Sequence, residues 1–223
     1  MAYTVLFENK PTATAPAAEV VITDVIDPSL DPATISIQNV RFGSTSIDFP
    51  EGTHTINTTA DLRPANNIVV HISSSIVGNS LRLDLLAIDP ITGKMPVDPS
   101  AGFLPPNKVP PQGEGSVSFT VWPRANLATA VQIRSRAQIT FDINAPISTP
   151  EWFNTVDNIK PASKVLGLPA NSVAVSFPVQ WSGSDTGVGV KDYSVYVSDN
   201  SGPFTPWIIN TSQTQALFTG LVP

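Results

Sequence analysis

The sequence predicts an all-β protein made of one antiparallel β-sandwich followed by a second, incomplete one. Apolar and polar residues alternate with a period of two in many short segments, which is the pattern of strands with one buried face. Nowhere do apolar residues recur at helical spacing over about 11 positions without a Pro, a Gly or a β-branched run intervening. The chain also holds 22 Pro and 13 Gly, which supply frequent turns.

The first part of the chain reads as a series of short strands rich in β-branched and aromatic residues. Turn signals such as Asp27-Pro28 separate these segments, and many strands at this spacing are typical of a sandwich or barrel. The segment Gln132–Phe141 is less regular, and its two arginines should share one solvated face. The expected strands cover residues 3–7, 20–25, 35–40, 68–72, 81–88, 117–121 and 139–143.

One long irregular segment, from Asp89 to Gly115, interrupts this series. Loops longer than about 12–15 residues are uncommon unless they are functional, disordered or held in place. Phe103 and Leu104 are adjacent large apolar residues that would form a sticky patch if exposed. We therefore expect both side chains to insert into the first core and to order the loop.

A domain boundary is expected where the composition changes between residues 146 and 161. The segment Asp157–Pro161 has the character of a linker, so the sequence divides into domains 1–157 and 158–223. The second domain has its own expected strands, which cover residues 164–168, 173–181, 192–198, 204–209 and 215–219.

The charge and the cysteine content exclude several classes of function. Lys and Arg number 12 against 18 Asp and Glu, and the net charge is −6. Nucleic-acid binding needs a basic surface that neutralises phosphates, and the sequence has none. The chain has no Cys, so it has neither disulfides nor thiolate metal sites. No segment reaches the roughly 20 apolar residues of a membrane-spanning helix, so no membrane insertion is expected.

Several segments of the first domain share a common pattern. An aromatic strand that ends in Asn opens the chain, and an A-x-x-V-x-(I/V)-T-D strand follows it. With three further segments, they resemble the repeated, immunoglobulin-like β-sandwich modules of giant bacterial surface proteins. The resemblance covers roughly residues 3–155 and implies a secreted or cell-surface location. The segments that carry it are Tyr3–Asn9, Ala17–Asp24, Asp27–Asp31, Ala101–Asn107 and Phe141–Ile147.

The second domain resembles a fibronectin-type-III module. Val179–Asp185 matches the strand that bears the core tryptophan, here Trp181, and Val190–Ser198 matches the next strand. Thr219–Pro223 matches the "GL-x-P" turn that leads to the sixth strand of such modules. The resemblance implies a spacer or a binding platform rather than an enzyme.

A sandwich of this type needs seven strands, and only five are expected here. The missing two would pair with Tyr193–Val197, whose backbone groups would otherwise lack partners. Truncation of the module, further residues beyond this sequence, or strands supplied by another chain would each explain the shortfall. The third explanation would give a homo-oligomer through strand addition, with Tyr3–Phe7 as a conceivable donor.

Carboxylates in the long loop suggest a calcium site. Asp89 and Asp98 lie in this loop, with Asn107 and Glu114 nearby. Ca²⁺ takes about 6–8 oxygen ligands, which loops of extracellular sandwiches can supply. The alternative is turn chemistry, because Asp before Pro or Ser commonly caps a turn through its own side chain. A second acidic group surrounds one strand end and consists of Asp24, Asp27 and Asp31.

The four tryptophans fall into different contexts. Trp181 is expected in the core, and Trp122 ends a strand before a proline. Trp152 and Trp207 are the candidate ligand-binding residues, because exposed indoles can stack on sugar rings. The alternative for Trp152 is that it packs with Phe153 between the two domains.

Catalysis is not expected. His54 and His71 are the only histidines, and no Gly-x-Ser-x-Gly motif accompanies the serines that follow His71. A covalent cross-link between Lys10 and Asp142 or Asn144 is conceivable, but Lys10 precedes a proline and should be exposed.

The leading hypothesis is therefore a non-catalytic structural or adhesive module of a secreted or cell-surface bacterial protein. It would act as a spacer and as an interaction platform for a protein or a surface glycan. A carbohydrate-binding accessory module of a secreted hydrolase is the alternative.

Overall fold

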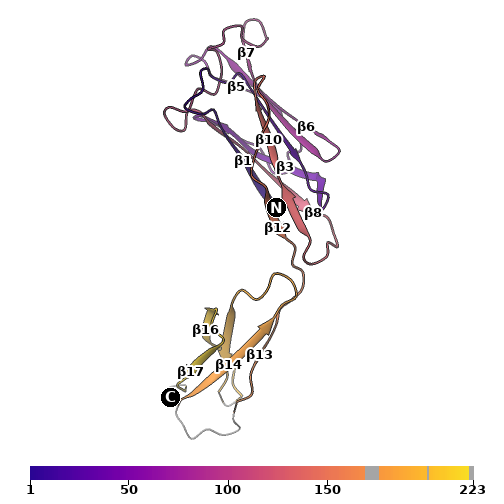
Figure 1. Cartoon of the computed structure of the whole chain (residues 1–223), viewed down its shortest axis with the longest axis vertical. Coiled ribbons are helices and arrows are strands. Elements are labelled where there is room, and N and C mark those ends of the chain that lie inside the picture. Colours follow the sequence, from indigo (N-terminus) through magenta and orange to yellow (C-terminus); the bar gives the residue numbers. More distant parts are fainter. Residues whose placement is uncertain (169–175, 200, 221–223) are drawn as a thin grey trace. The chain divides into compact units, whose positions relative to one another are not determined.

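The described chain consists of strands joined by turns and irregular loops. A computed structural model describes residues 1–168, 176–199 and 201–220, and in these residues the backbone forms no helix. The chain divides into two units, shown in Figure 1. Unit 1 comprises Met1–Leu127 and Gln132–Asn154, and unit 2 comprises Ala128–Val131 and the chain from Thr155 onward. The all-β prediction is confirmed, and the division falls a few residues before the boundary that the sequence suggested.

Unit 1 is built on two antiparallel sheets. The first has four strands in the order β1–β8–β3–β4, with bounds Ala2–Glu8, Glu114–Pro123, Leu30–Phe42 and Thr45–Asp48. The second has six strands in the order β11–β10–β2–β7–β6–β5. Their bounds are Ile147–Ser148, Ala137–Phe141, Glu19–Val25, Ser80–Ile88, Val69–Val77 and Asn57–Asp61.

The core of unit 1 follows from the alternation of side chains along these strands. In β8, Val117, Phe119 and Val121 are buried, while the intervening Ser and Thr side chains are half-buried on the other face. The inward rows of both sheets supply the remaining core, and Phe7 of β1 contacts Phe141 of β10 edge to face with ring centroids 6.3 Å apart. The sandwich expected from the sequence is therefore present.

The segment Gln132–Phe141 is not one strand but two. The chain breaks at Arg136, between β9 (Gln132–Ser135) and β10. Strand β9 pairs with β12 (Trp152–Thr155), whereas β10 pairs with β2 and β11. Arg134 forms an ion pair with Glu151 and lies over the Phe153 ring, 5.8 Å from its centroid.

The long loop between β7 and β8 is held against the sandwich. Phe103 and Leu104 are buried, as expected, and Leu104 is 0% exposed. Leu104 forms a backbone bridge with Ala17, whose N–H donates to the Leu104 carbonyl at 2.9 Å. Gly102 permits this approach, because a Cβ at that position would lie 2.5 Å from the Ala17 carbonyl oxygen.

Two buried asparagines secure the rest of this loop. The Asn9 amide donates to the carbonyl of Leu104 at 2.8 Å, and the Asn107 amide donates to Glu8 Oε1 at 2.7 Å. The Asn107 Oδ1 atom accepts a hydrogen bond from the N–H of Gly113. In this loop, side chains therefore provide hydrogen bonds that neighbouring strands would provide in a sheet.

Unit 2 contains five strands in its described part, the number expected. One sheet has the order β13–β14–β17, and the other pairs β15 with β16. Their bounds are Ala162–Val165, Phe177–Ser184, Gln215–Phe218, Tyr193–Val197 and Thr205–Thr211. The expected start of one strand at residue 173 and the end of the expected turn at residues 221–223 lie outside the described residues.

The core of unit 2 is small and aromatic. Val179, Trp181 and Val195 are buried, and partly buried aromatic residues pack around them. In the described part of the chain, β15 pairs only with β16, so its other edge carries no strand. The indole Nε1 of Trp181 is buried and has no hydrogen-bond partner among the described residues.

The burial of Leu104 leads to a prediction for stability. Leu104→Ala leaves a cavity under the loop and should lower the free energy of unfolding by about 2–5 kcal/mol, as measured by urea denaturation. Val97→Ala in the same loop is the control, because Val97 is 100% exposed and its truncation should change the stability by less than about 0.5 kcal/mol. Equal effects of the two substitutions would show that Leu104 does not secure the loop.

Candidate functional site

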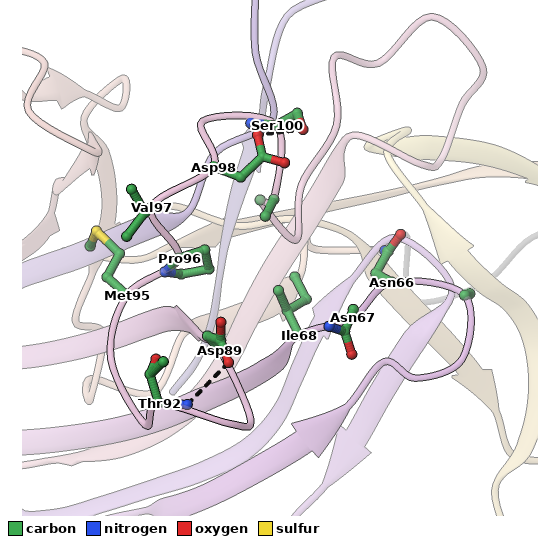
Figure 2. Close-up of a pocket in the computed structure, with 13 residues that line it drawn as sticks. Asn66, Asn67, Ile68, Asp89, Thr92, Met95, Pro96, Val97, Asp98 and Ser100 are labelled. Atoms are coloured by element: carbon green, nitrogen blue, oxygen red, sulfur yellow. Dashed lines mark hydrogen bonds between the residues drawn. The ribbon is translucent and has the colours of Figure 1, made fainter.

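One concave surface of unit 1 lies between two of its loops. The loop between β7 and β8 faces the loop between β5 and β6 across a pocket of about 490 Å³ (Figure 2). The lining combines amide, carboxylate and hydroxyl groups with apolar side chains. It consists of Ala65, Asn66, Asn67, Ile68, Asp89, Thr92, Met95, Pro96, Val97, Asp98, Ser100, Ala101 and Gly102.

Asp89 lies in this pocket at the first turn of the loop. Its Oδ1 atom accepts hydrogen bonds from the backbone N–H groups of Ile91 at 2.7 Å and Thr92 at 3.1 Å. Its own N–H donates to the Lys94 carbonyl, and Gly93 adopts a φ of 68°, which closes the turn. The carboxylate therefore takes the place of a backbone acceptor and fixes the turn.

Asp98 occupies a second turn of the same loop, also in the pocket. Its Oδ1 atom accepts hydrogen bonds from the Ser100 hydroxyl at 2.7 Å and from the Ser100 N–H at 2.8 Å. These two bonds, the hydroxyl bond first, hold the pKa of Asp98 below its usual value. The structure thus brings Asp89 and Asp98 into one pocket but uses one oxygen of each in a local turn.

The remaining acidic residues considered for a cation lie elsewhere in unit 1. Asn107 directs its amide to both Glu8 and Glu114, which face each other across β1 and β8. Among the residues that the structure describes, no group of three or more His, Cys, Asp or Glu is placed to hold a metal ion. Turn chemistry accounts for the observed contacts of Asp89 and Asp98.

Two apolar side chains of the pocket lining are exposed, whereas Ile68 is buried. Met95 and Val97 project from the loop opposite Asn66 and Asn67 (Figure 2), and Val97 is fully exposed. Exposed apolar side chains rimmed by polar groups are typical of interaction sites. The arrangement offers hydrogen bonds and apolar contact, which suits binding.

The two tryptophans expected to bind a ligand differ in their surroundings. Trp152 is 67% exposed and lines a groove of about 550 Å³ beside β1. Trp207 is partly buried, and its ring lies edge to face against Trp181 at 6.2 Å and Phe218 at 5.2 Å between centroids. The contacts of Trp207 are those of a packing residue that joins the two sheets of unit 2.

His71 joins two neighbouring strands through its side chain. His71 Nε2 and Asn57 Oδ1 lie 2.7 Å apart on neighbouring strands. Lys10 is exposed, and Asp142 accepts hydrogen bonds from the backbone N–H groups of Ala18 and Glu19. These contacts give Asp142 a structural role, as the partner of the backbone where β2 begins.

One residue that the sequence placed in an acidic group proves to be a core residue. Asp24 of β2 is only 2% exposed, and its Oδ1 atom has no hydrogen-bond partner among the described residues. Burial raises its pKa, and the hydroxyl of Ser135, 3.3 Å from Oδ2, opposes the rise only partly. The period-two count from Val20 and Ile22 already puts Asp24 on the inward face, so the pattern contained the signal.

Asp27, its neighbour in the sequence, behaves in the opposite way. Burial raises its pKa, but hydrogen bonds from the N–H groups of Arg134 and Ser29 outweigh burial and hold the pKa below the usual value. Asp27 thus connects the turn after β2 to β9, whereas Asp24 lies inside the sandwich.

The described part of the chain holds no helix with the length and apolar character that a membrane crossing requires. Residues 101–155 match a family described as a domain of unknown function (DUF7619). The matched segment runs from the middle of the long loop to β12 and covers well under half of the chain. No curated protein and no solved structure is significantly similar to the chain.

Asp89 allows the turn and the cation hypotheses to be separated. Asp89→Asn keeps an acceptor oxygen and should leave the melting temperature unchanged, whereas Asp89→Ala removes the acceptor and should lower it by a few degrees. Differential scanning fluorimetry with and without Ca²⁺ provides the measurement. If Ca²⁺ raises the melting temperature of the wild type and Asp89→Asn abolishes this rise, the pocket binds a cation instead.

Asp24→Asn should stabilise the protein at neutral pH. A folded pKa above the ordinary value of 3.8 means that the folded state holds a proton more tightly than the unfolded chain, so stability falls as pH rises through that interval. An amide cannot ionise and avoids this loss. We expect the variant to be more stable by on the order of 1 kcal/mol at pH 7 and to lose that advantage below pH 3.8. The free energy of unfolding of both proteins is measured by urea titration at several pH values. A difference between them that stays constant with pH would contradict a raised pKa of Asp24.

Proposed function

We propose that the chain is a non-catalytic structural and adhesive module of a secreted or cell-surface protein. It acts as a spacer and presents an interaction platform. The observation that supports this function most directly is the order of the loop between β7 and β8. Long loops without strands of their own are uncommon, and those that are ordered usually carry function.

One side of the loop between β7 and β8 packs on the sandwich, and its other side is exposed to solvent. Buried Phe103, Leu104 and Asn107 attach it to the sandwich, while Met95 and Val97 face solvent. A preorganised surface loses little conformational entropy on binding, which favours recognition of a partner. The loop pocket is the proposed platform, and the strands beneath it supply the rigidity that a spacer needs.

The carbohydrate-binding accessory module of a secreted hydrolase is the second candidate. The exposed indole of Trp152 beside a groove favours a carbohydrate-binding module. Such a module would also be exported, like the first candidate. Glycan binding that disappears with Trp152→Ala would favour this alternative over a spacer.

Surface display and adhesion can be tested together in the organism that makes the protein. Antibodies raised against the chain should label intact, non-permeabilised cells or detect the protein in the culture medium. Fab fragments that recognise the loop pocket should reduce attachment of the cells to their natural surface. Fab fragments against unit 2, which lacks the loop, serve as the control.

Two variants of the loop sharpen this test. Met95→Ser and Val97→Ser remove apolar contact from exposed positions and should reduce attachment without changing the melting temperature. Labelling that appears only after lysis would contradict the location. If neither the variants nor the Fab fragments change the attachment of the cells, the loop pocket is not the interaction platform.

A further inference from the structure

A second concave surface of unit 1 lies on the four-stranded sheet, and Trp122 is one of the residues that line it. It is a groove of about 600 Å³ between β3, the end of β8 and the loop that joins β4 to β5. The side chains that matter for its chemistry come from all three segments and are Gln38, Glu51, His54, Thr120 and Trp122.

Trp122 presents its ring to solvent from a fixed backbone. It continues the outward row of β8, opposite in direction to buried Phe119 and Val121, and is 67% exposed. The backbone N–H of Trp122 donates to the Thr34 hydroxyl at 2.9 Å, and that hydroxyl donates to the Asp31 carbonyl at 2.7 Å. An indole held open in this way combines an apolar face with one N–H donor.

The loop opposite Trp122 is also fixed. The N–H of Gly52 donates to the hydroxyl of buried Ser36 at 2.8 Å, and the Thr53 carbonyl accepts from the N–H of Ile37 at 2.8 Å. His54 Nδ1 lies 3.1 Å from the Ile35 carbonyl. Because a carbonyl can only accept, Nδ1 carries the hydrogen, and Nε2 is the ring nitrogen left for a ligand.

The charge of the groove restricts the ligand. Among the described residues that line it, no Lys or Arg occurs. The α-ammonium of Met1, which donates to the Val121 carbonyl at 2.6 Å, and the carboxylate of Glu51 leave the lining with no net charge. Phosphates, sulfates and carboxylates are normally held by Arg or Lys, so an anionic ligand does not suit this surface. A protein partner is also disfavoured, because protein hot spots cluster several large apolar anchors and this groove exposes one.

We propose that this groove binds a neutral oligosaccharide. The apolar C–H face of a pyranose ring stacks on the Trp122 indole, and the sugar hydroxyls form hydrogen bonds with Gln38, Glu51 and His54 Nε2. The outward row of β8 continues from Thr120 to Ser118, whose hydroxyl lies 3.0 Å from that of Thr4, and offers further hydroxyl groups to a longer chain. The site is separate from the loop pocket and does not depend on that pocket's function.

The full chain should be applied to an array of neutral hexose and N-acetylhexosamine oligosaccharides with sialylated and sulfated counterparts. The neutral glycans that are retained are then titrated by calorimetry. Trp122→Ala should weaken binding by at least about tenfold, and Trp122→Phe should restore part of it. Phe204→Ala is the control, because Phe204 is also an exposed aromatic residue, at 74%, and lies outside the groove.

Gln38→Ala provides a second test that leaves the Trp122 ring intact. It should weaken binding because it removes a hydrogen-bonding group. It should not alter the circular-dichroism melt, because Gln38 is exposed. The absence of any neutral ligand at millimolar concentration would overturn the proposal. A preference for anionic glycans would do the same, as would binding that depends on Trp152 rather than Trp122. None of these results would bear on surface display or on the loop pocket.

Discussion

The pairing of β8 with both β1 and β3 is the constraint on which unit 1 depends. Strand β8 lies between them, so its inward row of Val117, Phe119 and Val121 occupies the middle of the core. Its outward row ends in Trp122 and forms one wall of the groove. The start of β8 also determines where the long loop must return to the sheet. Packing, groove and loop geometry therefore all follow from the position of this strand.

The two candidate surfaces are organised by the same physical device. In each, the backbone of a loop forms hydrogen bonds with buried polar side chains. These are Asn9 and Asn107 for the long loop and Ser36 for the loop beside Trp122. Buried backbone groups need such partners when no strand supplies them. The polar side chains hold the loops in place while the exposed residues of the same loops stay available for contact.

Much of the strand pattern could be predicted from the sequence, because alternation with period two records which face of a strand is buried. Phe103 and Leu104 were equally predictable, since adjacent large apolar residues in a loop need cover. The break at Arg136 was not, because local alternation does not tell which sheet a strand joins. The packing of Trp207 could not be predicted either, because its cross-sheet neighbours Trp181 and Phe218 are distant in sequence. The groove at Trp122 was missed for the same reason, as Gln38 and His54 reach it from other segments.

The central position of β8 also affects the order in which the chain can fold. The first strand finds its partner more than a hundred residues later, as the contact between Met1 and Val121 illustrates. During synthesis, β1 must therefore wait until β8 has left the ribosome, and loop closure over such a distance is slow. The four-stranded sheet of unit 1 is therefore completed late, whereas consecutive strands such as β6 and β7 can pair as soon as both have been made.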